Sequence, residues 1–402
     1  MSEWQEVRLG DVLDKIVGGG TPSKENPSYW DGGDIFWCSV KDMSDDKFRI
    51  SQTKDTITLD GLQNSSSNLI PKGTVITATR MGLGRAFINE TDMAINQDLK
   101  ALIPNSTIDN KYLLWTIILY RNYIEMLGNG ATVKGIRLET FKNIKINLPP
   151  LPTQQKIAKI LSNYDDLIEN NLKRIKLLEE SARLTYEEWF LRFRIDGKKL
   201  DIDPATNLPF GWEKISLSDT GEFLNGYAFK PNDLQEEGLP VIKIKEMKSG
   251  VVEDTPRNPG DKINDKYLVL RGDILFSWSA SLEVIQWQYA NGWLNQHLFK
   301  VSPNSDFPKS FLYLSLRNSL HIFDYLTTGA TMKHIKRKEL DFVKIPTPSS
   351  DVLLKFDNLV NPMLEEILNL SHQNQLLKEA RDILLPRLMT NMIDTDDMDI
   401  AV

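Results

Sequence analysis

The sequence predicts an α+β protein in which two tandem homologous α/β domains are separated by two long helices that pair as an antiparallel coiled coil. Three observations predict this class. The chain repeats itself at an offset of 199 residues, each copy opens with short strand-like and helix-like runs, and each copy closes with a long heptad stripe. At 402 residues the chain is too long for one ordinary core and suits two domains.

The repeat is clearest in two octapeptides, GATVKGIR at 130–137 and GATMKHIK at 329–336. Nearer the N-terminus the offset drifts from 199 to 208 residues, because WQEVRLGD at 4–11 faces WEKISLSD at 212–219. Insertions and deletions in the first part of each copy explain the drift. The chain therefore consists of two homologous halves of about 200 residues each.

The first part of each half mixes short apolar runs with Gly, Pro, Asn and Asp breaks, which is typical of α+β proteins. In RLGDVLDKI (8–16) the spacing of the apolar residues predicts a helix, which the glycines at 18–20 end. The segment NKYLLWTIILYRNYIEML (110–127) predicts a buried helix. Strands are predicted for four runs: DIFWCSV (34–40), GTVITAT (73–79), RAFI (85–88) and KALI (100–103).

Residues 153–192 contain neither Gly nor Pro and carry a stripe, mostly apolar, at spacings of three and four for over four heptads. A second stripe begins at Phe356 and reaches Leu377. Each apolar stripe is narrow and needs a partner helix to cover it, so the two helices should pair. The first helix would span roughly 60 Å at about 1.5 Å per residue, which favours a spacer between the domains over a generic coiled coil. Asn171 and Asn374, both on the stripes, are either register-setting polar residues or tolerated polar positions.

These patterns divide the chain into five predicted segments. The predicted boundaries are 1–150 for the first domain, 151–195 for the central spacer helix, 196–348 for the second domain, 349–392 for the C-terminal spacer helix and 393–402 for an acidic tail.

Composition and motifs argue against catalysis and against a membrane. One cysteine, Cys38, excludes an internal disulfide and fits a reducing cytoplasm, and four scattered histidines match no familiar zinc spacing. GGGTPSK (18–24) does not meet the P-loop pattern, and GLGRAF (82–87) lacks the third glycine of a dinucleotide fingerprint. NLPPL (147–151) does not meet the Asn-Pro-Pro-aromatic motif. No apolar run reaches 18 residues, and the N-terminus has no signal-peptide core.

The chain resembles the specificity (S) subunit of a Type I restriction-modification system. Three stretches carry the resemblance in the family's order: GGTPSKENPSYWDGGDIFWCSVKDM (19–43), GATVKGIRLETFKNIKINLPPLPTQQKIAKIL (130–161) and DPATNLPFGWEKISLSD (203–219). The second copy departs from the first, because LNGYAFKPNDLQEEGLPVIKI (224–244) replaces the GGTPS opening and PTPSSDVLL (346–354) replaces PPLPTQQKI. The two domains should therefore read different DNA sequences.

The resemblance implies a non-catalytic subunit that binds double-stranded DNA. Each target-recognition domain would read one half of a split target, and the helix pair would fix the gap between the halves. Two modification (methyltransferase) subunits would dock on the helices and methylate adenine, and restriction subunits would translocate and cleave DNA. S-adenosylmethionine, ATP and Mg would belong to those partners, and no cofactor to this chain. Two alternatives stay open: a methylation-only assembly, and a scaffold that binds proteins or glycans, favoured by the net charge of −7 and the aromatic content.

A negative chain needs a local basic surface to hold DNA, and each half has one. Residues 129–148 and 329–345 each carry a net charge of +3. Their candidate phosphate-binding residues are Lys134, Arg137 and Lys142 in the first half and Lys333, Lys336, Arg337 and Lys338 in the second. A solvated basic turn is the alternative in both halves.

Residues that recognise bases need side chains, such as guanidinium or amide groups, that can form paired hydrogen bonds with base edges and that turns can present to the DNA. Arg80 and Arg85 flank the turn MGLG, and arginine pairs with guanine through two hydrogen bonds. Lys24 and Tyr29 near the GGTPS loop are further candidates. The dipeptide Asn-Gln recurs identically at 96–97 and 295–296, which favours hydrogen bonds within the fold over base discrimination.

The spacer helix carries charged residues outside its apolar stripe. Five of them are candidates for contact with a methyltransferase partner, with a solvated helix face as the alternative: Glu179, Glu180, Arg183, Glu187 and Glu188.

Overall fold

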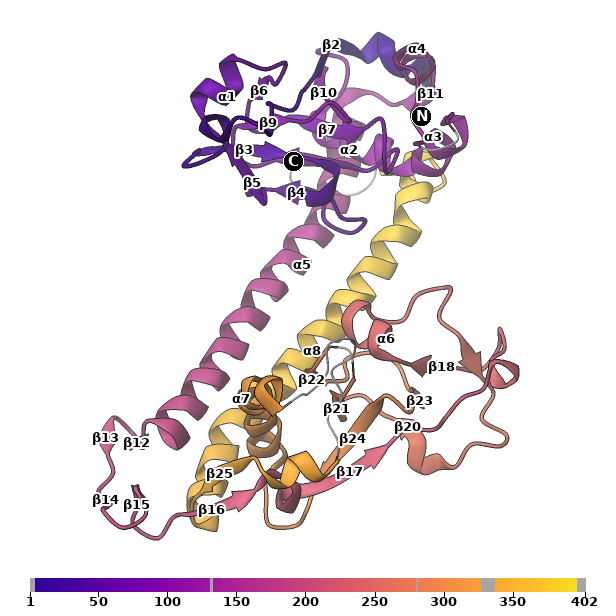
Figure 1. The fold of residues 1–402 in the computed structure, drawn as a ribbon. Helices are drawn as coiled ribbons and strands as arrows, with labels where there is room; N and C mark the ends of the chain where they lie inside the picture. Colours follow the sequence, from indigo (N-terminus) through magenta and orange to yellow (C-terminus); the bar gives the residue numbers. More distant parts are fainter. Residues whose placement is uncertain (1–3, 131–132, 280, 327–336, 396–402) are drawn as a thin grey trace. The chain divides into compact units, whose positions relative to one another are not determined.

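The computed structural model describes residues 4–130, 133–279, 281–326 and 337–395 (Figure 1). The chain forms two compact units, and each unit contains one copy of the repeat with one end of each long helix. Unit 1 is Met1–Ile168 with Leu377–Val402, and unit 2 is Glu169–Leu376. The predicted domain boundaries, which assign each long helix to one segment, stay a prediction.

Unit 1 is built on two small sheets. One has five strands in the order β2 (Leu13–Gly18), β10 (Leu99–Pro104), β7 (Val75–Ala78), β8 (Ala86–Asn89) and β4 (Arg49–Ile50). The other has four, in the order β5 (Asp55–Ile57), β3 (Ile35–Cys38), β9 (Met93–Ile95) and β6 (Leu69–Ile70). A separate pair joins β1 (Gln5–Arg8) to β11 (Lys145–Leu148). The helices are α1 (Leu59–Gln63), α2 (Asn110–Leu119), α3 (Arg121–Leu127) and α4 (Leu138–Lys142).

Helix α2 packs against strands β7 and β8 and fills the core of unit 1. Its N-cap is Asp109, whose carboxylate accepts hydrogen bonds from the backbone N–H groups of Lys111 and Tyr112 at 2.9 and 3.0 Å. Because the helix is apolar on nearly every side, it can only be stable when surrounded, and Trp115 is buried within it. The helix predicted over 110–127 is confirmed with a break at Tyr120, but only its first part, α2, is buried: α3 buries Ile124 and exposes Tyr123 and Met126.

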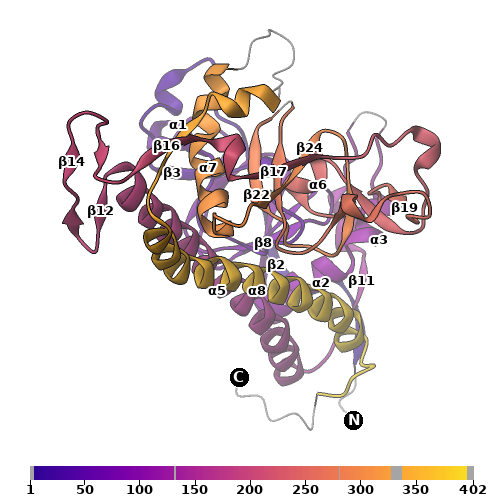
Figure 2. The same ribbon diagram turned by 90° about the horizontal axis from the view of Figure 1, so that it is seen from below.

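Unit 2 repeats this plan. One sheet has the order β17 (Gly221–Asn225), β24 (Leu298–Pro303), β21 (Ile274–Ser277) and β22 (Glu283–Gln286). The other has the order β19 (Arg257–Asn258), β18 (Leu239–Ile242), β23 (Gly292–Leu294) and β20 (Leu268–Val269). Strand β16 (Glu213–Ser216) pairs with β25 (Lys344–Thr347), and the helices are α6 (Ile244–Ser249) and α7 (Lys309–Leu326). Two short hairpins, β12–β13 (Arg194–Ile195, Lys198–Lys199) and β14–β15 (Ile202–Asp203, Leu208–Pro209), project from this unit (Figure 2).

The strands confirm the repeat read from the sequence. Strands β7 and β21 begin 199 residues apart, at Val75 and Ile274, and occupy the same position beside β10 and β24 in their sheets. Strands β1 and β16 begin 208 residues apart, at Gln5 and Glu213, as the drift of the offset predicts. The two halves therefore share one fold, although their sequences differ at most positions.

The long helices are α5 (Leu151–Tyr186), continued by a π-helical turn at Glu187–Leu191, and α8 (Ser350–Met389). In unit 2 they run antiparallel, because Asn171 faces Asn374 while Arg174, one turn further along α5, pairs with Glu366, earlier on α8. The Asn171 amide donates to the Asn374 carbonyl oxygen at 3.0 Å, and both side chains are only 6% exposed. A buried amide pair favours this register over shifted ones, which supports the register-setting alternative.

Two sequence expectations need correction. The helix predicted over 8–16 is wrong: a 3-10 turn at Leu9–Val12 buries its two apolar residues, and β2 then pairs with β10. Pairing with β10 along one side gives β2 backbone hydrogen bonds within the sheet, which outweighs a short helical pattern. The heptad spacing also predicts Thr185 on the apolar stripe of the first long helix, which is wrong: Thr185 is half-exposed and Tyr186 is buried, so the stripe shifts by one residue where the π-helical turn begins.

Candidate nucleic-acid interface

The tip of the β7–β8 hairpin is a turn that its glycines make possible. Met81, Gly82 and Gly84 all have positive φ, at 52°, 98° and 72°. A Cβ at Gly82 would lie 3.2 Å from the Cδ of Arg85, so the glycine leaves room for that side chain over the turn. The hairpin therefore presents Arg80 and Arg85 at its two shoulders, where the sequence placed them.

The segment after α3 folds back against this hairpin tip. The Met81 N–H donates to the Lys134 carbonyl at 3.3 Å, and the Ile136 N–H donates to the Thr79 carbonyl at 3.0 Å. Together with Val40, the two segments line an open surface hollow of about 380 Å³, whose other residues are Met81, Gly82, Arg85, Val133 and Lys134. Two separately predicted candidates, Arg85 and Lys134, are thus brought to one surface hollow.

Arg80 stands beside this hollow with a carboxylate behind it. Its guanidinium lies 3.5 Å from the buried carboxylate of Asp98, while 52% of its side chain remains exposed. The Asn96 amide donates to the same carboxylate at 3.2 Å, and its carbonyl oxygen accepts from the Asp98 N–H. The recurring Asn-Gln pair therefore does bond within the fold, as expected. Burial lowers the pKa of the neighbouring Lys100, and the charge of Asp98 acts in the opposite direction.

Arg85 also has a carboxylate partner, and this one is shared. The Asp45 carboxylate lies 2.7 Å from Nε of Arg85 and 2.9 Å from Nη2 of Arg121. Both arginine side chains are 28% exposed. Sequence reasoning missed Arg121 and Asp45, because Arg121 lies within a segment predicted as a buried helix and Asp45 is one of several acids in a loop. Only the fold brings them to the hairpin.

The remaining candidates of unit 1 lie outside the lining of the hollow. Arg137 is the exposed N-cap residue of α4, and Lys142 is exposed at its end. Lys24 is exposed in the loop before a 3-10 turn at Pro27–Tyr29. Tyr29 is half-buried, and its carbonyl accepts from the Thr58 N–H at 3.0 Å, so its placement also fits a structural role.

The equivalent hairpin in unit 2 carries different chemistry. The residues 199 positions after Thr79, Arg80 and Asp98 are Trp278, Ser279 and His297. The Trp278 ring lies 5.8 Å from the ring of His297, and its indole N–H donates to Asn225 at 3.2 Å. A serine and a histidine thus stand where unit 1 has an arginine and a carboxylate, and an indole ring stands in place of Thr79. Among the basic candidates of this half, Lys338 is exposed in a 3-10 turn that begins at Arg337, whereas Lys333, Lys336 and the Arg337 side chain lie outside the described residues.

The candidate partner-binding residues on α5 lie mostly along one groove. A cavity of about 580 Å³ lies between α5 and α7 in unit 2, and Leu314 and Arg317 form part of its α7 wall. Its α5 wall includes four of the five candidates: Glu179, Glu180, Arg183 and Glu187. The fifth, Glu188, is not part of the lining and pairs with Arg192. Arg183 pairs with Glu187, so several of these charges already have partners within the helix.

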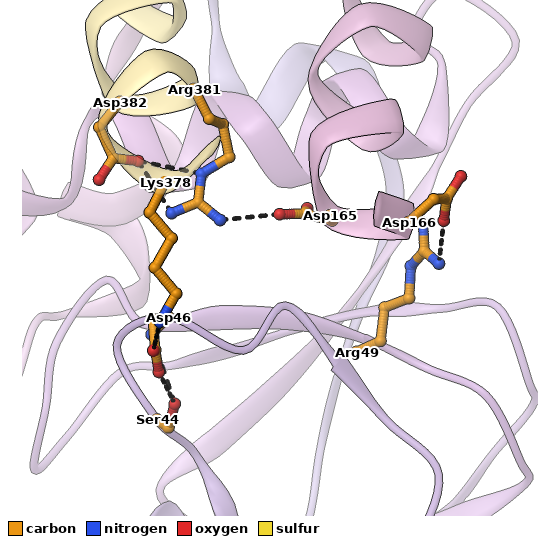
Figure 3. A network of polar contacts seen from close by, with 8 residues as sticks. All are labelled: Ser44, Asp46, Arg49, Asp165, Asp166, Lys378, Arg381 and Asp382. Atoms are coloured by element: carbon orange, nitrogen blue, oxygen red, sulfur yellow. Dashed lines mark hydrogen bonds and ion pairs between the residues drawn. The ribbon is translucent and has the colours of Figure 1, made fainter. Parts of the chain in front are cut away.

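A polar network joins the recognition fold of unit 1 to its two helix ends (Figure 3). Arg381 of α8 is 3% exposed and donates to Asp165 of α5 at 2.7 Å. Its guanidinium also lies 4.7 Å from the ring centre of Phe48. Arg49 pairs with Asp166 of α5 at 2.5 Å, and Lys378 of α8 pairs with Asp46. The loop Ser44–Arg49 is thereby held by both helices.

The described part of the chain contains no cluster of three His, Cys, Asp or Glu residues placed to hold a metal ion. No helix among the described residues is both long enough and apolar enough to cross a bilayer.

Comparison with known proteins agrees with this arrangement. The family model for the Type I restriction modification DNA specificity domain matches residues 1–180 and 209–356. The MjaIX specificity subunit of Methanocaldococcus jannaschii is 28% identical over 418 aligned positions, which cover 98% of this chain and 95% of the relative. The HindI specificity subunit of Haemophilus influenzae is 23% identical and covers 98% and 100%. A crystal structure of an S subunit from M. genitalium has the same fold, with a TM-score of 0.61, 17% identity and 96% of each chain covered.

Proposed function

Because the chain belongs to the family of Type I restriction-modification DNA specificity proteins, we propose that it reads a bipartite DNA target, one half with each unit. The observation that carries the proposal is the contrast between the two hairpins. Their first strands begin 199 residues apart, but Arg80 and its partner Asp98 in one unit are replaced by Ser279 and His297 in the other. One strand arrangement with different side chains after the first hairpin strand suits two different half-sites.

In unit 1 the hollow beside the β7–β8 hairpin is the proposed reading surface. Arg80 and Arg85 would pair with guanine edges in the major groove, and Lys134 would neutralise a phosphate. The net charge of −7 is no obstacle, because the basic side chains gather locally. Arg137 and Lys142 would extend the phosphate contacts along α4, as Lys333, Lys336, Arg337 and Lys338 would in the other half. Lys24 and Tyr29 are weaker candidates, since they lie away from the hollow's lining.

The helix pair would fix the gap between the half-sites and dock two DNA methyltransferase subunits, with the groove beside Glu179 and Arg183 as one contact. The chain itself is a non-catalytic subunit. The assembled complex would methylate adenine and, with restriction subunits, cleave DNA at the expense of ATP, in the cytoplasm. S-adenosylmethionine, ATP and Mg would be held by those partners. A methylation-only assembly is the alternative, and co-purification of the complex from its native cell separates the two.

Methylation-site mapping in cells that express the chain with its methyltransferase tests the proposal. The expected result is one bipartite motif with two defined halves and a fixed unspecified gap. Methylation without a split motif would overturn it, and so would a complex that binds random duplex with no dependence on salt.

The spacer role has its own test, an insertion of seven residues into both long helices. One heptad in each keeps the apolar seam in phase and adds roughly 10 Å, which corresponds to about three base pairs. The expected motif keeps both half-sites and lengthens its gap. The control inserts seven residues into α5 alone, which breaks the pairing of Asn171 with Asn374 and should abolish methylation. An unchanged gap in the double insertion would refute the spacer role.

A further inference from the structure

The loop Ser44–Arg49 lies between the candidate reading surface and the helix ends of unit 1. On one side, Asp45 contacts Arg85 and Arg121. On the other side, the next residue, Asp46, pairs with Lys378 of α8 and accepts a hydrogen bond from the Ser44 hydroxyl at 2.7 Å. One short loop therefore touches Arg85 of the hollow, the neighbouring Arg121 and the helices that carry the unit.

Asp45 contacts one edge of the Arg85 guanidinium. Its Oδ2 accepts a hydrogen bond from Nη2 at 3.4 Å, and its Oδ1 lies 2.7 Å from Nε as an ion-pair contact that is not aligned as a hydrogen bond. The carboxylate therefore occupies the Nε–Nη2 edge of the guanidinium and leaves the Nη1–Nη2 end of the fork for another acceptor pair. That end is the one that can approach the O6 and N7 atoms of a guanine head-on. A side chain at Gly82 would press on this guanidinium, since a Cβ there would lie 3.4 Å from both Nε and Nη1.

We propose that Asp45 is a positioning residue for base recognition: it holds Arg85 and Arg121 in fixed orientations so that Arg85 reads one base of the first half-site. This inference rests on the proposed function and deepens it. Asp45 touches no base in this role, and it acts by restricting where the arginine fork can point. A freely rotating arginine would have to be ordered on binding, and it would reach several neighbouring acceptors equally well.

The exposure of Asp45 supports a positioning role over a purely structural one. Asp45 is 57% exposed, and exposed ion pairs contribute little to folding stability. A carboxylate that bridges two arginines at 2.7 and 2.9 Å nevertheless restricts both side chains. Substitution of Asp45 should therefore leave the fold intact and change the orientation of the two guanidinium groups.

The anchors behind the loop keep Asp45 itself in place. Phe48 lies under the buried Arg381 guanidinium, and Arg49 pairs with Asp166 of α5 at 2.5 Å. Lys378 holds Asp46, the immediate neighbour of Asp45. The position of the reading arginine thus depends on contacts from both long helices, although those helices are distant from the hairpin in sequence.

The test compares Asp45→Asn, Asp45→Glu and the unchanged chain, each co-expressed with the methyltransferase, by methylation-site mapping. Asp45→Asn removes the charge, and we expect discrimination at one base of the first half-site to fall roughly two- to twelve-fold. The second half-site and the gap should stay unchanged, which makes the target its own internal control. Asp45→Glu keeps the charge and should retain the base preference. The matched control is Asp254→Asn, which removes an exposed carboxylate paired with Lys245 in unit 2 and should change neither half-site.

Each result decides the inference. An Asp45→Asn motif identical to the unchanged one would overturn it while leaving the bipartite reading intact. A uniform loss of methylation at all targets, together with a lowered thermal unfolding midpoint, would assign Asp45 to folding and also overturn it. If the unchanged chain gives no split motif, the proposed function itself fails, and that outcome is visible before any variant is compared.

Discussion

The two units share one strand arrangement but carry different side chains at equivalent positions. Arg80 follows β7 and pairs with Asp98 in unit 1, and the equivalent residues in unit 2, where β21 begins 199 residues after β7, are Ser279 and His297. The backbone is maintained by buried strand residues, which tolerate only similar shapes. Arg80 keeps 52% of its side chain exposed, so this position can change its chemistry without unfolding the sheet. Difference at equivalent positions is therefore a better guide to recognition here than recurrence.

In each unit the ends of the long helices pack against the sheets, and we call this packing the joint of the unit. The two joints also use different side chains. In unit 2 the end of α5 contributes Tyr186, Trp189 and Phe190, and Phe190 lies 4.8 Å from the ring of Phe356. The residues 199 positions later, at the end of α8 in unit 1, are Leu385, Leu388 and Met389, all buried. Unit 1 adds the buried Arg381–Asp165 pair and its surface ion pairs. One joint is thus aromatic, and the other is aliphatic and ionic.

The largest effect should come from breaking the ionic joint. Arg381→Met removes the cation that faces Asp165 in the core of unit 1, and losing one partner of a buried pair costs about 3–5 kcal/mol. Denaturant unfolding would measure the loss, and hydrogen exchange followed by mass spectrometry would locate it. Protection should fall in unit 1 and be retained in unit 2.

A double substitution separates the cost of an unpaired buried charge from the loss of the ion pair itself. Combining Arg381→Met with Asp165→Leu removes both charges and should recover most of the lost stability, because apolar replacements of a buried pair are often neutral.

Phe190→Ala in the aromatic joint should cost about 3–5 kcal/mol in unit 2 through the cavity it leaves. If Arg381→Met weakened both units equally, the separate character of the two joints would be refuted.

The next effect concerns the hairpin tips. Arg80→Ser gives unit 1 the residue that unit 2 has at the equivalent position. If Arg80 makes a two-pronged contact with guanine, its loss should reduce discrimination at one base of the first half-site by about 1–3 kcal/mol. Binding of duplexes substituted one base at a time would measure it. The matched change in the other tip, Ser279→Ala, should leave the first half-site unaffected, and an Arg80→Ser chain with an unaltered first half-site would exclude Arg80 as a reader.

The sequence predicted the repeat, the paired helices, four of the strands and the place of Arg80 and Arg85, because periodicity and turn residues are local signals. It mistook residues 8–16 for a helix, since a 3-10 turn followed by an edge strand leaves the same apolar spacing as one helical face. It could not find Asp45, Arg121 or Arg381, because their roles come from partners 40 to more than 200 residues away in sequence. Long-range charge pairing has no signature in a single sequence.

A smaller effect should follow from Lys134→Ala. As a phosphate contact, Lys134 carries no base information, so its loss should weaken binding uniformly across target sequences. The slope of log affinity against log salt should decrease in magnitude by about 0.9, the share of one neutralised phosphate. Titrations at several salt concentrations measure this slope. Lys72→Ala, an exposed lysine of the same unit that does not line the hollow, is the control and should leave the slope unchanged. A change of base preference in Lys134→Ala would contradict the phosphate role.

The smallest effect concerns the ion pair between Asp46 and Lys378 on the ionic joint. Burial acts to raise the pKa of Asp46, but hydrogen bonds from Lys378 and Ser44 outweigh it and leave this pKa below its ordinary value. A carboxyl with a depressed folded-state pKa stabilises the fold above the ordinary aspartate pKa, and this contribution is lost as the pH falls through the folded-state value. Asp46→Asn should therefore cost about 0.2–1 kcal/mol at neutral pH and nothing in strong acid, because the pair is exposed. Denaturant unfolding of both chains across that pH range would measure the difference, which high salt should also remove. A cost that persists unchanged into acid would mean that the Asp46 side chain contributes through packing rather than charge, and the contrast between an ionic and an aromatic joint would then rest on Arg381 alone.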